Sequence, residues 1–258
     1  MAEDAVNLYF VGTAGSGKSV MTATFREWMS SMGLDAIVAN LDPGAELLPY
    51  EPEIDIREWI VLSDVMHEYG LGPNGAQIVC ADLLALRAGE VKALLDRFHS
   101  DYVLFDTPGQ VELFAFREAS RHVVNLLGAD RSMLVFLFDP LLARIPSGFV
   151  ALLMLCATVQ FRFSIPMVNV LSKSDMLSEA DVAKIVEWSE DAYKLNDALM
   201  AERSALSLDI STHLFRALDA QGVYKTIIPA SSQTRFGFED IYNAAQQTFA
   251  GGEDLTQD

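Results

Sequence analysis

The chain has 258 residues, of which 51% are apolar, enough for a single large α/β domain spanning residues 1–258. Its 36 acidic residues outnumber its 18 basic residues and leave a formal charge of -18, so the surface should repel phosphate backbones and direct binding to nucleic acid is not expected. The two cysteines suggest neither a disulfide framework nor a metal site.

The chain starts with Met1-Ala2-Glu3-Asp4, followed by an apolar stretch. A secretory signal would place positive charge at this point, so we expect a cytoplasmic protein. The most membrane-like segment, 149–161, is shorter than the roughly 20 apolar residues of a spanning helix. We predict that it is a buried helix and expect no membrane association.

Short apolar runs recur along the chain and are predicted to be strands, at 6–11, 36–39, 102–105, 133–138, 167–171 and 226–228. Because these runs are apolar on both alternating faces, they favour a parallel sheet covered by helices on both sides. Stretches with helical spacing lie between them, at 19–32, 111–127 and 238–249. The alternation predicts a three-layer α/β fold with a mostly parallel sheet.

The first predicted strand leads into a complete phosphate-binding loop, Gly12-Thr13-Ala14-Gly15-Ser16-Gly17-Lys18-Ser19, with Val20 next in the helix. In this pattern backbone N–H groups surround a phosphate at a helix N-terminus. Lys18 is suited to reach the β and γ oxygens of a nucleotide, and Ser19 to bind Mg²⁺. The alternative is a chance glycine-rich turn. The full match after a strand favours a nucleoside triphosphatase that uses residues 12–20 for binding.

The second predicted strand ends in Asn40-Leu41-Asp42-Pro43. Asp42 is placed where a carboxylate could meet the metal or the attacking water. Taken alone, Asp before Pro is better explained as a helix cap or an Asx turn.

A stretch with helical spacing at 56–69 is followed by Leu71-Gly72-Pro73-Asn74-Gly75. From the residues alone this segment is a stop signal, with glycine past the helix end, proline beyond it and then an Asn-Gly turn. The residues by themselves therefore predict a turn here.

The strand at 102–105 is followed by Asp106-Thr107-Pro108-Gly109-Gln110. A phosphate-loop protein needs a second acidic residue at a strand end to hold its metal, and Asp106 fits this need. The Asp-x-x-Gly-Gln pattern is typical of regulatory GTPases, where the glycine amide senses the γ-phosphate and the glutamine orients water. The alternative is an ordinary turn after a strand.

The segment from Asn169 to Asp175 closes a strand and is similar to the Asn-Lys-x-Asp pattern of guanine-binding proteins, with Ser172 in place of the asparagine. The Asp175 carboxylate can accept both the ring N1–H and the exocyclic amine of guanine, and the Lys173 stem can cover the base. The alternative is that Ser174-Asp175 caps a helix. After the last strand, Pro229-Ala230-Ser231-Ser232 lies where GTPases place a short loop whose backbone touches the guanine oxygen.

The region 178–222 is polar and helical in spacing, without a strand-like run. We predict a helical insertion within the single domain, before the last strand. The tail after residue 250 is polar and is expected to fray.

These motifs resemble those of the GPN-loop GTPases, a family of dimeric P-loop proteins, along nearly the whole chain. The most specific element is the triplet Gly72-Pro73-Asn74, which has the letters of the family name. The resemblance implies a homodimer in which this triplet enters the partner's site and Asn74 approaches the γ-phosphate or the water. It also implies GTP and GDP as ligands, with Ser19, Asp106 and Asp42 near Mg²⁺.

By the same resemblance Gln110, Asp42 and Glu112 are candidates for positioning the water, with Gln110 ranked above Glu112. Glu112 has an alternative role as a first-turn carboxylate favoured by the helix dipole. The family implies a nucleotide-dependent switch in assembly of a protein complex. Its client is unknown, and the family suggests a relation to RNA polymerase biogenesis.

Two other functions compete with GTP hydrolysis. One is a P-loop kinase that passes the γ-phosphoryl group to a small acceptor, although Arg203 and Arg216 are isolated and form no arginine-rich lid. The other is a related ATPase, which commonly has an additional lysine early in the phosphate loop. Here that segment is Gly12-Thr13-Ala14, without lysine.

Overall fold

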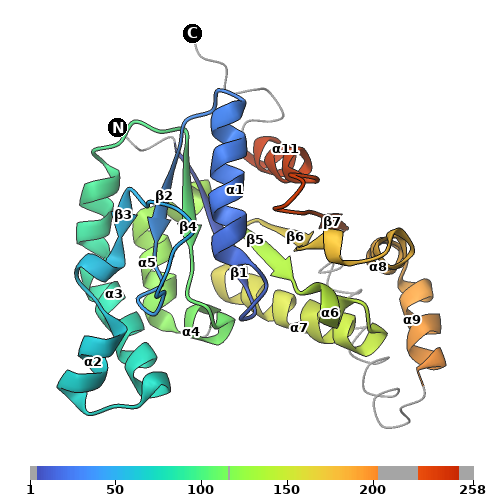
Figure 1. Cartoon of the computed structure of the whole chain (residues 1–258), viewed down its shortest axis with the longest axis horizontal. Coiled ribbons are helices and arrows are strands. Elements are labelled where there is room, and N and C mark those ends of the chain that lie inside the picture. The colour runs from blue at the N-terminus through green and yellow to red at the C-terminus, as the bar shows by residue number, and fades with distance from the viewer. Residues whose placement is uncertain (1–4, 116, 203–225, 250–258) are drawn as a thin grey trace.

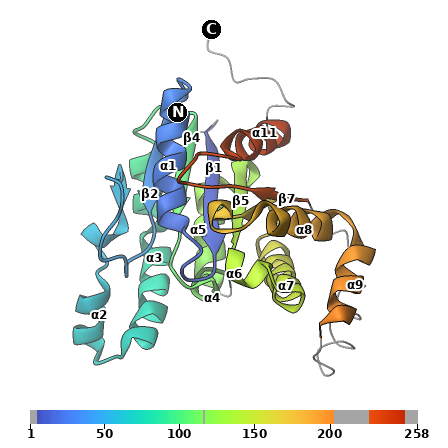
Figure 2. The same ribbon diagram turned by 45° about the vertical axis from the view of Figure 1, so that its right-hand side comes forward.

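The computed structural model of the chain describes residues 5–115, 117–202 and 226–249, without the side chains of Glu112 and Leu113. A central sheet lies between two helical layers (Figure 1), and the same layers are visible after a turn of 45° (Figure 2). The predicted three-layer α/β fold is confirmed.

In the described part of the chain, seven strands form one sheet in the order β3-β2-β4-β1-β5-β6-β7, and every neighbouring pair is parallel. The strands are β1 Val6–Gly12, β2 Ala36–Asn40, β3 Ile54–Asp55, β4 Tyr102–Asp106, β5 Ser132–Phe138, β6 Met167–Leu171 and β7 Ile227–Pro229. All the predicted apolar runs are strands. Only β3 is unpredicted, because two residues are too short to show a period.

Helices connect the strands in chain order. The α-helices are α1 Lys18–Ser31, α2 Leu62–Tyr69, α3 Pro73–Leu95, α4 Val111–Ala115, α5 Glu118–Gly128, α6 Pro140–Ala143, α7 Pro146–Phe163, α8 Glu179–Glu190, α9 Ala192–Ala201 and α11 Phe238–Phe249. Short 3₁₀ turns are η1 Ile56–Glu58, η2 Ala129–Arg131 and η3 Ser174–Met176.

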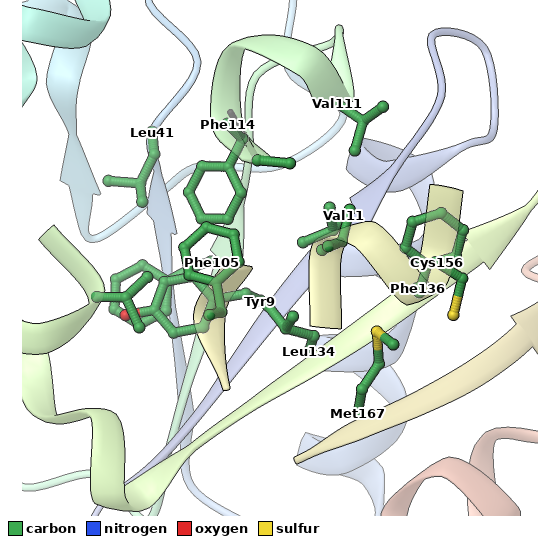
Figure 3. Close-up of a cluster of buried hydrophobic side chains, with 14 of the residues drawn as sticks. Tyr9, Val11, Leu41, Phe105, Val111, Phe114, Leu134, Phe136, Cys156 and Met167 are labelled. Carbon is green, nitrogen blue, oxygen red and sulfur yellow. The ribbon is translucent and has the colours of Figure 1, made fainter. Parts of the chain in front are cut away.

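The two faces of the sheet bury separate hydrophobic clusters. Along β1, Leu8 and Phe10 point to the side of α1 and α11, whereas Tyr9 and Val11 point to the side of α3, α5 and α7. In Figure 3 Tyr9 lies beside Phe105 of β4, and the two rings stack with centroids 4.3 Å apart. Each fully buried aromatic side chain contributes about 2–3 kcal/mol to folding. These clusters fix the strand ends that position the site.

The stretch 111–127, predicted as one helix, is two helices, α4 and α5. Arg117 between them has an extended backbone, with φ −93° and ψ 132°. Both helices contact α3, and α4 contacts α7 as well. The extended Arg117 interrupts the helix between the two parts.

The predicted helix at 56–69 is also divided, into η1 and α2, with an extended residue, Val61, immediately before α2. Gly70, in the left-handed region at φ 62°, ends α2. The turn predicted at Gly72 to Gly75 is wrong, since Gly72 caps α3, Pro73 is its first residue and Asn74 lies in its first turn. Proline suits this position because its missing N–H has no helical partner there anyway.

The apolar segment 149–161 lies within α7, which by length and composition alone could cross a membrane. Phe149, Leu152 and Cys156 are buried against the rest of the domain. Phe161 is 85% exposed, so one face of α7 is buried rather than the whole helix. This is the packing of a helix that covers a sheet.

The predicted insertion at 178–222 begins with two helices, α8 and α9. Residues 203–225 lie outside the described residues, as do Arg203, Arg216 and the tail after residue 249. The extent of the insertion stays a prediction.

Candidate nucleotide site

The carboxyl ends of the parallel strands meet at one edge of the sheet. The strand register pairs Phe10 of β1 and Asn40 of β2 with Asp106 of β4. Leu171 of β6 pairs with Pro229 of β7 further along the same edge. Ligands of open α/β sheets bind at such an edge, and all the motifs predicted from sequence except Gly72-Pro73-Asn74 follow a strand here.

The phosphate loop between β1 and α1 needs its glycines for two reasons. Gly15 and Gly17 have φ values of 79° and 92°, in the left-handed region that favours glycine. A Cβ on Gly12 would lie 2.7 Å from both Leu137 O and Ser16 Oγ. The loop therefore curves tightly into the first turn of α1, which has no side-chain cap. Open N–H groups at a helix start suit a phosphate.

Lys18 lies inside this loop with 5% of its surface exposed. Its Nζ donates to Gly12 O at 2.9 Å, to Thr13 O at 3.0 Å and to Gly109 O at 2.9 Å. The ammonium group is thus held between the phosphate loop and the segment after β4. A lysine in this place lies within the loop that would surround a phosphate.

Asp106 ends β4 and is 1% exposed. Burial raises the pKa of its carboxyl to about 6, although polar contacts with Ser19 and Tyr50 lower it. Tyr50 Oη donates to Asp106 Oδ2 at 2.7 Å, whereas Asp106 Oδ1 is buried without a hydrogen-bond partner.

A buried carboxylate that contacts the Ser19 side chain fits Mg²⁺, which prefers oxygen ligands. The described residues contain no group of three or more His, Cys, Asp or Glu side chains that could hold a metal ion. Magnesium in a nucleotide site needs no such group, because phosphates and waters fill most of its coordination. Ser19 and Asp106 therefore remain suitable partners for the metal.

Asp42 follows β2 and faces the segment after β4. Its Oδ1 accepts from Gly44 N at 2.9 Å and its Oδ2 accepts from Gly109 N at 3.1 Å. Burial raises the pKa of Asp42, while these backbone N–H groups and Lys18 oppose the rise. Asp42 thus forms the Asx-type turn that sequence alone favoured, and it also reaches the Asp106–Gln110 segment.

A polar cluster formed by Asn40, Asp55 and Arg57 holds the backbone at Asp42. Asn40 Oδ1 accepts from Asp42 N at 3.0 Å, and its Nδ2 donates to Asp55 Oδ1 at 2.9 Å. Burial raises the pKa of Asp55, but hydrogen bonds from Arg57 and Asn40 outweigh it and keep the pKa below its usual value. Arg57 Nη1 also donates to Ala45 O at 2.8 Å. The loop that holds Asp42 is therefore anchored at both ends.

Of the remaining candidates for water positioning, those that the structure describes have exposed side chains. Gln110 is exposed immediately after Gly109, and the side chain of Glu112 lies outside the described set. Gly72, Pro73 and Asn74 are all exposed at the start of α3. Both ribbon views place the turn between α2 and α3 apart from the β1–α1 loop (Figures 1 and 2).

A cavity of about 460 Å³ extends from the phosphate loop to the loop after β6. Its lining includes Lys173 and Asp175, the two residues predicted to bind the base, together with Val20 from α1. Lys173 Nζ donates to Gly15 O at 2.5 Å, and a Cβ on Gly17 would lie 3.2 Å from Lys173 Cε. The lysine stem thus forms one wall of a cavity that has the place and size for a nucleotide base.

Ser172, which replaces the asparagine of the guanine pattern, is buried beneath this loop. Its Oγ donates to Phe138 O at 2.9 Å, and its backbone N donates to the same carbonyl at 3.1 Å. A short side chain therefore fits the close approach of the loop to the end of β5.

Ser231 is buried, and its Oγ accepts from Gln233 N at 3.2 Å and from Thr234 N at 3.3 Å. It lines a neighbouring cavity, whereas Ser232 and Gln233 line the base cavity. Ser232 belongs to the loop predicted from sequence, whereas sequence reasoning missed Gln233 and, beside Asp106, Tyr50. Gln233 was detectable as the continuation of the loop after β7, whereas Tyr50 had no local signal.

The chain is similar to known proteins over nearly its whole length. A family model described as "Conserved hypothetical ATP binding protein" matches residues 10–251. The GPN-loop GTPase PAB0955 of Pyrococcus abyssi is 34% identical over 255 residues, which are 96% of this chain and 98% of the relative. The GPN-loop GTPase QQT1 of Arabidopsis thaliana is 37% identical over 171 residues, 65% of this chain and 57% of that protein.

The crystal structure of PAB0955, described as a GTPase in apo form from Pyrococcus abyssi, is also similar. Its TM-score is 0.84 at 30% sequence identity, covering 95% of this chain and 97% of the other. The matched segments span little more than half the length of the Arabidopsis thaliana relative and 62% of GPN-loop GTPase 1 of Dictyostelium discoideum.

Proposed function

The chain belongs to the GPN-loop GTPase family and is a GTPase, and from this premise we propose that it is a magnesium-dependent, dimeric switch for assembly of a protein complex. The observation that supports the dimer is the exposure of Asn74 in the first turn of α3, a helix end that lies apart from the β1–α1 loop of its own chain (Figure 1). A residue placed there is available to a second copy, which can supply in trans what the first lacks.

We call the part of the site around the phosphate loop and Asp106 the phosphate end, and the cavity beside Lys173 and Asp175 the base end. The phosphate end would bind the triphosphate through the N–H groups of residues 12–19. Lys18 would exchange its three carbonyl partners for the β and γ oxygens, because a phosphate is the stronger acceptor. Ser19 and Asp106 would hold Mg²⁺, which when bound offsets the charge that develops on the phosphate oxygens. In this proposal the chain's own residues mainly position and neutralise the triphosphate.

Gly109 links nucleotide binding to catalysis. Its N–H donates to Asp42 and its carbonyl accepts from Lys18. If the N–H turns to the γ-phosphate, as in regulatory GTPases, Asp42 Oδ2 is released and can accept a proton from the attacking water. Gln110 and the partner's Asn74 would orient that water, with Glu112 as a further candidate.

The switch would follow from the same exchange. Gly109 in the segment 106–110 can hydrogen-bond either to Asp42 and Lys18, as in this structure, or to the γ-phosphate. Hydrolysis removes the γ-phosphate and so leaves only the first arrangement. A change in this segment would alter how two copies meet and, through them, how a protein client is held. The client, the cytoplasmic location and the absence of nucleic acid and membrane partners remain predictions.

The base end supports GTP over ATP, although the matching family model has ATP in its description. The test is single-turnover hydrolysis of GTP and ATP by the purified chain, with Mg²⁺ and with EDTA. We expect a preference for GTP of about 100-fold or more, because adenine leaves the Asp175 carboxylate without donors, and loss of activity in EDTA. A preference for ATP, or a need for an added phosphoryl acceptor, would contradict the proposal and favour a related ATPase or a kinase.

The dimer is tested separately by light scattering with GDP and with a nonhydrolysable GTP analogue. We expect a dimer with the analogue and a different hydrodynamic radius with GDP. A monomer under both conditions would rule out the trans-acting Asn74 while leaving GTP hydrolysis untouched.

A further inference from the structure

Tyr50 makes a contact at the phosphate end that no sequence motif predicts. It lies in the loop that connects β2 to β3, the same loop that holds Asp42. Its hydroxyl donates to Asp106 Oδ2 at 2.7 Å. We propose that Tyr50 is a positioning residue for Mg²⁺, which fixes the Asp106 carboxylate so that Oδ1 stays available to the metal. The proposal rests on the magnesium site proposed above.

The two oxygens of Asp106 have different surroundings. Oδ2 has Tyr50 as a partner, whereas Oδ1 is buried with no hydrogen-bond partner. A carboxylate with one oxygen held by a neutral donor cannot rotate freely about its terminal bond, so the other oxygen keeps a fixed direction. Residues that orient a metal-binding carboxylate in this way commonly alter metal affinity 10- to 100-fold when they are changed.

Tyr50 is itself held in place by the segment that follows it. Arg26 of α1 donates to Glu51 O at 3.3 Å and forms an ion pair with Glu53. Glu53 Oε2 accepts from Val38 N at 2.7 Å, and Glu53 N donates to Val38 O at 2.9 Å. The segment is thus tied to both α1 and β2.

The tyrosine ring packs on the hydrophobic cluster beneath α1. Tyrosine keeps its phenolic proton near neutral pH, so the Tyr50 hydroxyl remains a donor. A packed ring with an anchored backbone is what a positioning residue requires, since a mobile donor would fix nothing.

The test compares Tyr50→Phe with a matched control, Tyr102→Phe. Each change removes one hydrogen-bonded hydroxyl. Tyr102 lies at the opposite end of β4 from Asp106, where its hydroxyl accepts from Gln246 Nε2 at 2.7 Å. The affinity for a fluorescent GDP analogue is measured in EDTA and over a Mg²⁺ titration. Thermal unfolding of each variant is measured without nucleotide.

We expect Tyr50→Phe to bind the analogue in EDTA as the wild type does, and to need about tenfold more Mg²⁺ for the same gain in affinity. Tyr102→Phe should keep the wild-type Mg²⁺ dependence. A merely structural role of Tyr50 would change the unfolding temperature and the affinity in EDTA instead.

Three outcomes would overturn the proposal. If Tyr50→Phe has a wild-type Mg²⁺ dependence, the hydrogen bond from Tyr50 to Asp106 does not affect metal binding. If Tyr50→Phe needs less Mg²⁺ than the wild type, Tyr50 competes with the metal. Equal weakening in Tyr50→Phe and Tyr102→Phe shows a general effect on β4. Failure of the magnesium site itself is distinguishable, because then Asp106→Asn would also respond to Mg²⁺ as the wild type does.

Discussion

The two ends of the nucleotide site are built differently. At the phosphate end, Lys18 and Asp106 are buried and each is held by groups from another loop. At the base end, Asp175 is exposed on the wall of an open cavity of about 460 Å³, and Lys173 is held there by the carbonyl of Gly15. The charged groups at the phosphate end are thus already held in place by this chain, whereas Asp175 at the base end has an exposed side chain that a base could contact.

The difference follows from what each end has to do. Stabilising charge on a triphosphate requires donors and charges that are already in place and shielded from water. Choosing one base requires only that the wrong base leave a polar group unpaired. Changes at the phosphate end should therefore affect rate and metal dependence, and changes at the base end should affect which nucleotide binds.

The largest effect is expected for Lys18→Ala. Single-turnover GTP hydrolysis should fall about 10³-fold, because a buried cation aimed at the phosphates is lost. The matched control is Lys173→Ala, a lysine at the base end, which should weaken GTP binding more than it slows the bound complex. A hydrolysis rate of Lys18→Ala within tenfold of the wild-type rate would contradict the proposal that the phosphate end determines the rate and the base end determines which nucleotide binds.

The next effect concerns stability and comes from Asp106. Its folded pKa, about 6, lies above the ordinary value of 3.8, so this group favours the folded state below pH 4 and loses that contribution as the pH rises through 6. In EDTA at pH 7.5, Asp106→Asn should be more stable than the wild type by up to about 3 kcal/mol, and the difference should shrink towards pH 4.

Urea unfolding at both pH values measures this difference, with Asp181→Asn, a partly exposed acid at the start of α8, as the control. A variant that is less stable than the wild type at pH 7.5 would show that the buried carboxylate is not a cost to folding. The burial of Asp106 would then not lower the free energy of unfolding in the way that its raised pKa indicates.

A smaller effect is expected at the base end. Asp175→Asn should weaken GTP binding about 30-fold, the loss of a charged hydrogen-bonding partner, and should bind xanthosine triphosphate better, because the new amide can donate to the extra carbonyl of xanthine. The Mg²⁺ dependence should not change. Glu179→Gln, in the adjacent cavity, is the control, and unaltered base preference in Asp175→Asn would remove Asp175 from the base site.

The sequence predicted the sheet well because its strands are short apolar runs that need no partner to be recognised. It missed α3, although Ala76, Cys80, Leu84 and Ala88 form a buried row at helical spacing. Apolar residues also lie on the exposed face of α3, such as Leu86, which is 81% exposed, so the sequence shows no clear helical period here. The Gly72-Pro73-Asn74 segment was misread for the same reason, as the helix that follows it was not recognised.

Within the site, the local motifs were predictable and the contacts between motifs were not. The phosphate loop and Asp175 are recognisable from their neighbours in sequence. Tyr50 lies 56 residues from Asp106, in a loop without a motif, and only the packing of that loop on α1 brings the two together. The link from Asp42 to Gly109 likewise depends on the register of β2 beside β4.

The most direct test of the central claim, that a working site needs two chains, is to mix Lys18→Ala with Asn74→Ala. Each variant alone should hydrolyse GTP slowly, Asn74→Ala by about 10²-fold. In a mixed dimer, one site combines an intact Lys18 with the partner's intact Asn74, so a 1:1 mixture should recover about a quarter of wild-type activity. Activity equal to the mean of the two separate variants would contradict the claim and return Asn74 to a structural role at the start of α3.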